Sequence, residues 1–195
     1  MADKNIVSEF QIFLNSDPTK EAFKNRLRVE EGKGKRGRPG FVYPDSKGNP
    51  AIGIGHLVSA GDKPLFEKLF GKEIGYDKLM SGEKALSDAQ MEALLDYDVN
   101  RKVKTSKKLF ESFDSFTPKM RGAILDGVYR GDLSASPKTI GLINKGKFKE
   151  ASMEYLDHAG YRKSKVEKTG IYKRMDRNAA IIADEDMYTM RPLKK

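Results

Sequence analysis

Two carboxylic acid residues, Glu31 and Asp45, stand where a regular element meets a loop. Glu31 closes a helical apolar pattern and precedes Gly32, a typical helix terminator. Asp45 falls in a glycine-containing turn between two apolar segments, a pattern that predicts a β-hairpin. An acid that protonates the leaving oxygen and a carboxylate that activates water can together cleave a glycosidic bond. Because the chain has 28 Asp and Glu residues, the pair alone is not decisive.

The elements that must position this pair are predicted from local patterns. Asp17-Pro18 is typical of a helix start, so a helix should run from there to Gly32. Short strands are predicted at 41–43 and 51–57, on either side of the turn that holds Asp45. Between helix and hairpin, residues 33–40 form a basic Gly/Pro-rich stretch that predicts a loop.

Helical patterns dominate the rest of the chain. Ser87 and Gln90 form a capping box that opens a helix of about 20 residues, long enough to connect two lobes. Further helices are predicted from Thr117 and Ser136, each followed by proline, and over 147–156 and 171–182. Phe110, Phe113 and Phe116 are expected in the core; the alternative is a sugar-binding platform.

The predicted fold class is α+β, mostly helical and two-lobed. We expect one domain over 1–195, with an N-terminal extension at 1–19 and an N-terminal lobe with its hairpin at 20–86. A connecting helix at 87–110 then leads to a helical C-terminal lobe at 111–195.

The amino-acid composition limits the kinds of site and partner that the protein can have. The chain has no cysteine and two histidines, which excludes disulfides and cysteine nucleophiles and disfavours a zinc site. The net charge is +9, and residues 101–195 hold 22 Lys and Arg against 12 Asp and Glu, a net +10. Such a charge indicates a polyanionic partner (nucleic acid, anionic membrane or cell wall) or serves solubility alone.

Three short motifs together resemble one family. Glu31-Gly32, then Tyr43-x-Asp45-x-x-Gly48, then Ile-Gly-Ile-Gly-His-Leu at 52–57 resemble the phage T4-type lysozymes, endolysins and muramidases of glycoside hydrolase family 24. Segments 86–99 and 170–174 are similar to the family's connecting helix and late Gly-Leu-x-x-Arg motif. The resemblance covers roughly residues 20–182 and is most specific in 31–57.

The resemblance implies that the protein hydrolyses peptidoglycan, cleaving the β-1,4 bond between N-acetylmuramic acid and N-acetylglucosamine. Glu31 matches the general acid, and Asp45 the carboxylate that positions or activates water. The family inverts configuration, so the two carboxyl groups should stand far enough apart to hold a water molecule. Neither a cofactor nor a metal ion is expected.

Supporting positions are implied in the same way. His56 should form an ion pair with Asp98 of the connecting helix. Leu57, Tyr129 and Arg130 fall where the family lines its substrate groove. Arg174, in the late motif, is expected to pair with Glu31 or to be an ordinary surface arginine.

Two departures from the family pattern keep alternatives open. Ala51 replaces a threonine whose hydroxyl helps to hold the attacking water, which favours a non-catalytic wall-binding or virion structural protein as the second hypothesis. The basic stretch 33–40 is an insertion between the two carboxylates. Within it, Lys35–Pro39 resembles an AT-hook core, which makes DNA binding a less favoured third hypothesis.

The expected location follows from what the sequence lacks. The first residues do not have the pattern of a signal peptide, and no apolar run is long enough to span a membrane. We therefore expect synthesis in a host cytoplasm and action on the cell wall. A holin pore would release the protein at lysis, or a phage tail would deliver it. A monomer is expected, with peptidoglycan as partner.

Overall fold

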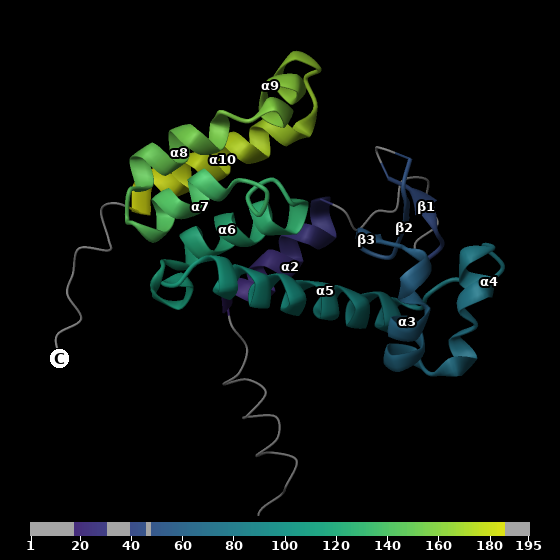
Figure 1. Cartoon of the computed structure of the whole chain (residues 1–195). Helices are drawn as coiled ribbons and strands as arrows, with labels where there is room; N and C mark the ends of the chain where they lie inside the picture. The colour runs from purple at the N-terminus through teal and green to yellow at the C-terminus, as the bar shows by residue number, and fades with distance from the viewer. Residues whose placement is uncertain (1–17, 31–39, 46–47, 186–195) are drawn as a thin grey trace, which may run out of the picture. The chain divides into compact units, whose positions relative to one another are not determined.

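The computed structural model describes residues 18–30, 40–45 and 48–185. Within these ranges the fold is mostly helical, with one small three-stranded antiparallel sheet, as the predicted α+β class requires (Figure 1). The chain forms two compact units. One consists of residues 24–101 and the other of residues before 24 and after 101. The unit boundaries fall inside two helices, α2 (Pro18–Glu30) and α5 (Asp88–Leu109).

Helix α2 begins at Pro18, as the Asp-Pro pair predicts, and ends at Glu30. Phe23 and Leu27 lie four residues apart and therefore share a face of the helix. Both are buried. The helix thus ends directly before Glu31, which lies outside the described residues, as does 33–39.

The sheet consists of β1 (Tyr43–Pro44), β2 (Pro50–Ile52) and β3 (His56–Leu57). β2 lies in the middle and pairs antiparallel with both neighbours. Ala51 is opposite Tyr43 on one side and Leu57 on the other, so this departure from the family pattern lies between two residues of the resembling motifs.

The predicted single strand over 51–57 is wrong. The chain turns at 53–55, and its two halves pair with each other as β2 and β3. Gly53 has φ 60° and Gly55 has φ 77°, values in the left-handed region that glycine adopts at little cost. The two glycines therefore permit a tight reversal instead of an extended strand.

The remaining elements of this unit enclose a small core. Helices α3 (Lys63–Phe70) and α4 (Tyr76–Met80), both too short to be predicted from periodicity, follow the sheet and precede the first part of α5. The buried cluster contains one residue of β2, residues of α3 and α4, and apolar residues up to α5: Ile52, Phe66, Ile74, Tyr76, Leu79, Leu86 and Leu94. The predicted capping box forms: Gln90 N donates to Ser87 Oγ, and Ser87 N donates to Gln90 Oε1.

The other unit is helical. After α5 it contains α6 (Pro118–Arg130), α7 (Pro137–Asn144), α8 (Phe148–Leu156), α9 (Ala159–Val166) and α10 (Gly170–Asp184). α10 packs against α6, α8 and α9, and α7 packs against α8 (Figure 1). The three phenylalanines at 110, 113 and 116 are all buried, which confirms their prediction as core residues.

Long-range hydrogen bonds connect the start of α6 to the end of α10 in this unit. Thr117 N and Oγ1 donate to the two carboxylate oxygens of Glu185, at 2.9 and 2.6 Å, so the start of α6 is bound to the residue after α10. Thr117 also caps α6, as its position before Pro118 predicts, because its Oγ1 accepts from Met120 N. Across the described residues, every helix is too short or too polar to cross a bilayer.

Candidate active site

Asp45 lies directly after β1, and its carboxylate is held by its own turn. Asn49 donates twice to it, from the backbone nitrogen to Oδ1 at 2.8 Å and from Nδ2 to Oδ2 at 3.1 Å. The backbone closes the same turn, since Asp45 N donates to Asn49 O and Gly48 N donates to Asp45 O. Asp45 is half-buried. The arrangement presents an oriented carboxylate, which can position water or accept its proton.

Tyr43 links β1 to the turn between β2 and β3. Its hydroxyl accepts from Gly55 N at 3.2 Å and lies 3.4 Å from Gly53 O, to which it donates. This phenol therefore holds the 53–55 reversal against the strand that leads into Asp45. The Tyr-x-Asp motif thus has a structural role in addition to any role in catalysis.

His56 and Asp98 form the contact that the sequence analysis expected. His56 Nδ1 lies 2.7 Å from Asp98 Oδ2, and both residues are buried. On the other side of the ring, Nε2 lies 3.9 Å from Asp62 Oδ2. Asp98 Oδ1 also accepts from Arg101 Nη2 at 3.4 Å. The pair fixes the start of β3 against α5 within this unit.

Two ion pairs that sequence reasoning missed connect α2 to α5. Arg28 donates from Nε and Nη2 to the two oxygens of Glu92, at 2.8 and 2.6 Å. One turn earlier, Lys24 Nζ lies 2.6 Å from Asp96 Oδ1. The Arg28 guanidinium lowers the pKa of Glu92. These contacts hold the last turn of α2, the segment that leads into Glu31.

Ala51 and Leu57 lie on neighbouring strands but in different environments. Ala51 is 1% exposed, so its methyl group is packed inside the unit. Leu57 is 57% exposed and is available to a ligand. The role of Leu57 in substrate binding stays a prediction.

In the helical unit, the two expected groove residues both have internal partners. Tyr129 packs edge-on against Phe23, with ring centroids 5.8 Å apart, and Lys102 Nζ lies 5.8 Å from its ring centroid. Arg130 forms an ion pair with Asp132, and its side chain is 13% exposed. A groove function for Tyr129 and Arg130 stays a prediction, and only a small part of Arg130 is accessible to a ligand.

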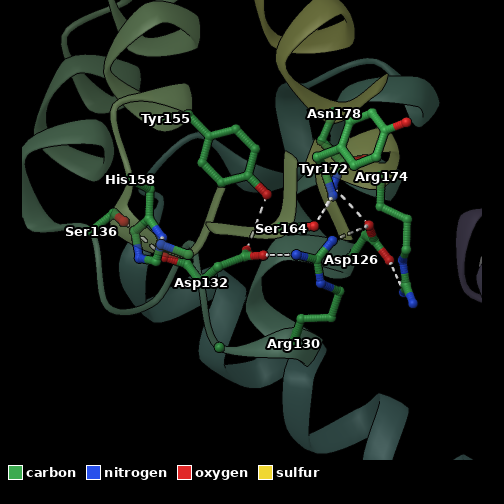
Figure 2. A network of polar contacts seen from close by, with 12 residues as sticks. Asp126, Arg130, Asp132, Ser136, Tyr155, His158, Ser164, Tyr172, Arg174 and Asn178 are labelled. Carbon is green, nitrogen blue, oxygen red and sulfur yellow. Dashed lines mark hydrogen bonds and ion pairs between the residues drawn. The ribbon is translucent and has the colours of Figure 1, made fainter. Parts of the chain in front are cut away.

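Asp126 is the centre of a charge network that the sequence analysis did not predict (Figure 2). It is fully buried on α6 and accepts from Arg174 Nη2 at 2.5 Å and from Asn178 Nδ2 at 2.7 Å. The guanidinium groups of Arg177 and Arg130 lie 3.6 and 3.9 Å from it. Because Arg174 and Asn178 belong to α10, the carboxylate joins two helices.

The expected pair between Arg174 and Glu31 stays a prediction, because Glu31 lies outside the described residues. What the structure adds is that Asp126 orients the Arg174 guanidinium. The sequence contains a signal that Asp126 is buried and has a partner. It is a single acid within the apolar run 124–128 of a predicted helix. A charge at such a position is seldom buried without a partner.

The network continues from Arg130 to Asp132 and Tyr155. Tyr155 donates from its hydroxyl to Asp132 Oδ1 at 3.0 Å (Figure 2). Burial raises the pKa of Asp132 and also raises the pKa of Tyr155. Among the described residues, no group of three or more His, Asp or Glu side chains is arranged so that it could hold a metal ion.

Comparison with known proteins points in the same direction as the motifs. The chain is 26% identical over 142 residues to a protein of Dictyostelium discoideum named probable T4-type lysozyme 2, covering 68% of this chain and 81% of that protein. No family model matches the sequence. The similarity, the mostly helical α+β fold and the small sheet that holds the Tyr-x-Asp motif support the resemblance to T4-type lysozymes.

Proposed function

We propose that the protein is a peptidoglycan hydrolase of the muramidase type. It cleaves the β-1,4 bond between N-acetylmuramic acid and N-acetylglucosamine with inversion. Glu31 protonates the leaving oxygen, and Asp45 positions or activates the attacking water. The similarity to a T4-type lysozyme supports the class of enzyme, and the residue roles come from the motifs.

The observation that carries this proposal is the geometry of Asp45. Its two oxygens accept from Asn49, and its strand is bound through Tyr43 to the 53–55 turn. β3, which follows that turn, is bound to α5 through His56 and Asp98. A carboxylate that must direct one water molecule needs this kind of support, since small misplacements lower rates strongly.

The test is hydrolysis of purified peptidoglycan, followed by chemical analysis of the products. New reducing ends on muramic acid identify a muramidase, and the anomer released first distinguishes inversion from retention. Asp45→Asn should reduce turnover about 100-fold or more, because an amide cannot accept the proton of water. Asn49→Ala should reduce it less, because the carboxylate is kept but loses two donors. Reducing ends on glucosamine would contradict the proposal.

A second candidate function is favoured by Ala51. With no hydroxyl at this buried position, one water contact of the family is missing, and the fold could serve as a non-catalytic wall-binding or virion structural protein. Binding of peptidoglycan without release of any reducing ends would identify this function.

The DNA-binding alternative depends on Lys35–Pro39, which lies outside the described residues. Salt-dependent binding to plain duplex DNA would support it. We further propose that the protein reaches the wall from a host cytoplasm, through a holin pore or within a virion. Its presence or absence in purified particles separates these two routes.

A further inference from the structure

Two large aliphatic side chains are exposed at the turn between α9 and α10. Val166, the last residue of α9, is 83% exposed, and Ile171, in the first turn of α10, is 41% exposed. Figure 1 shows this turn at one edge of the helical unit, where α9 packs against α10. We call residues 163–173 the α9–α10 tip.

The backbone of the tip is held in place from inside. Ser164 is buried, and its Oγ accepts from Tyr172 N at 2.9 Å (Figure 2). Its carbonyl oxygen accepts from Thr169 N at 3.0 Å, and its hydroxyl contacts that of Thr169. The exposure of Val166 and Ile171 therefore belongs to a defined turn.

The tip is strongly basic. It holds four lysines, at 163, 165, 168 and 173, and one acid, Glu167, which gives a net charge of +3. All four lysines are exposed. Glu167 lies 3.7 Å from Lys163, so the acid faces one of the four cations. Exposed aliphatic groups and positive charge thus occupy the same turn.

Lys168 has an unusual backbone conformation. Its φ is 53°, and within the described ranges it is the single non-glycine residue with positive φ. Glycine or asparagine adopts this conformation at lower cost than lysine. Lys168 follows the C-cap Glu167 and ends α9 in the left-handed conformation, and its side chain is exposed on the tip.

The presence of both aliphatic and basic side chains on the tip favours one kind of polyanionic partner. A nucleic acid or a glycan would pair with the lysines but would gain nothing from Val166 or Ile171. A lipid surface uses both groups, because aliphatic side chains enter the boundary between headgroups and acyl chains while lysine stems extend to the phosphates. We propose that the α9–α10 tip docks the protein onto a membrane rich in anionic phospholipids. This docking does not depend on the proposed glycosidase activity.

Co-sedimentation with vesicles tests the aliphatic part. The full chain should bind vesicles with about one third phosphatidylglycerol and should not bind pure phosphatidylcholine vesicles. Val166→Ser combined with Ile171→Ser should weaken binding about tenfold, since two aliphatic groups no longer leave water. Met153→Ser is the matched control, because Met153 is 66% exposed on α8 and is not one of the tip residues. It should bind as the unchanged protein does.

Two double variants with the same net charge test the contribution of the tip lysines. Lys165→Glu with Lys168→Glu should weaken vesicle binding at least tenfold, because each basic residue near an anionic surface contributes to binding. Lys104→Glu with Lys108→Glu on α5 changes the net charge equally and should have a much smaller effect. Equal losses in the two double variants would overturn the proposal, because binding would then follow total charge alone.

Insertion itself can be observed, since the chain contains no tryptophan. Val166→Trp introduces a single reporter whose emission should shift to shorter wavelength when anionic vesicles are added. An unshifted emission, or no vesicle binding by the unchanged protein, would overturn the proposal. So would tip variants that keep vesicle binding but lose binding to purified peptidoglycan. Thermal unfolding of each variant, monitored by circular dichroism, verifies that it is folded.

Discussion

His56 Nδ1 lies 2.7 Å from Asp98 Oδ2, and both side chains are buried. The two residues are 42 positions apart and connect β3 to α5. Removal of one partner leaves the other charged or polar group buried without compensation, which costs more than the pair itself contributes. The contact is therefore expected to matter for the stability of the unit that holds Asp45.

We predict that Asp98→Ala lowers the free energy of unfolding by about 3–5 kcal/mol, as measured by urea denaturation. Asp77→Ala is the control, because the Asp77 side chain is 80% exposed and its pair with Lys63 faces solvent. It should change stability little. If Asp98→Ala unfolded at the same urea concentration as the unchanged protein, the pair would not be a structural contact.

The stability of the protein should be equally sensitive to the loss of the Asp126 carboxylate. Asp126→Ala leaves Arg174 and Asn178 without their shared acceptor, so we expect a loss of about 3–5 kcal/mol in the free energy of unfolding. Asp126→Asn keeps one acceptor oxygen and should lose less. Asp176 is exposed on α10 and accepts a hydrogen bond from the Tyr161 hydroxyl, so Asp176→Ala should be nearly neutral. A variant Asp126→Ala that is as stable as Asp176→Ala would contradict the network.

The pair Arg28–Glu92 gives a pH-dependent prediction. The pKa of Glu92 is lowered in the folded state, first by its hydrogen bonds to Arg28. Its stabilisation is therefore fully present above the unfolded pKa of about 4.3 and is lost as pH falls through the folded value. Since Glu92 is 41% exposed, the effect should stay below about 1 kcal/mol.

Urea unfolding of Arg28→Met between pH 7 and pH 2 measures this effect. The variant should be less stable than the unchanged protein at neutral pH, and the difference should vanish in acid. The double variant Arg28→Met with Glu92→Gln should lack this pH dependence. A difference that is the same at both ends of the range would show that the lost stability comes from packing of the Arg28 stem.

Ala51 is the position where a single change should increase activity. Ala51→Thr supplies a hydroxyl that can hold water, so the rate of peptidoglycan hydrolysis should rise, by up to about 100-fold. Because Ala51 is 1% exposed, added volume can disturb packing, and Ala51→Val is the matched control with equal volume and no hydroxyl. If threonine and valine had the same effect on rate, another group would already hold the water.

Local chemistry made part of the fold predictable. The proline after Thr117 and the hydrogen bonds between Ser87 and Gln90 act within a few residues. The starts of these helices could therefore be predicted from the sequence. The reversal at Gly53 and Gly55 was missed because alternating apolar residues favour a strand, whereas two positive φ angles impose a turn.

The charged contacts of the candidate site were less predictable. The pair His56–Asp98 was expected only from the family resemblance, and Asp126–Arg174 was not expected at all. Their partners are 42 and 48 residues apart, and no local pattern specifies which distant cation meets a given acid. Spacing alone identified Asp45 as an acid in a turn, but not the two donors that Asn49 provides.

The central claim depends on Glu31, and turnover of purified peptidoglycan by Glu31→Gln tests it most directly. An amide cannot protonate a glycosidic oxygen, so release of reducing muramic acid ends should fall below detection while thermal unfolding is unchanged. Glu30→Gln, one residue earlier, is the matched control and should retain activity. Near-normal turnover by Glu31→Gln, with loss of activity in Glu30→Gln, would contradict the assignment and transfer the acid role to Glu30.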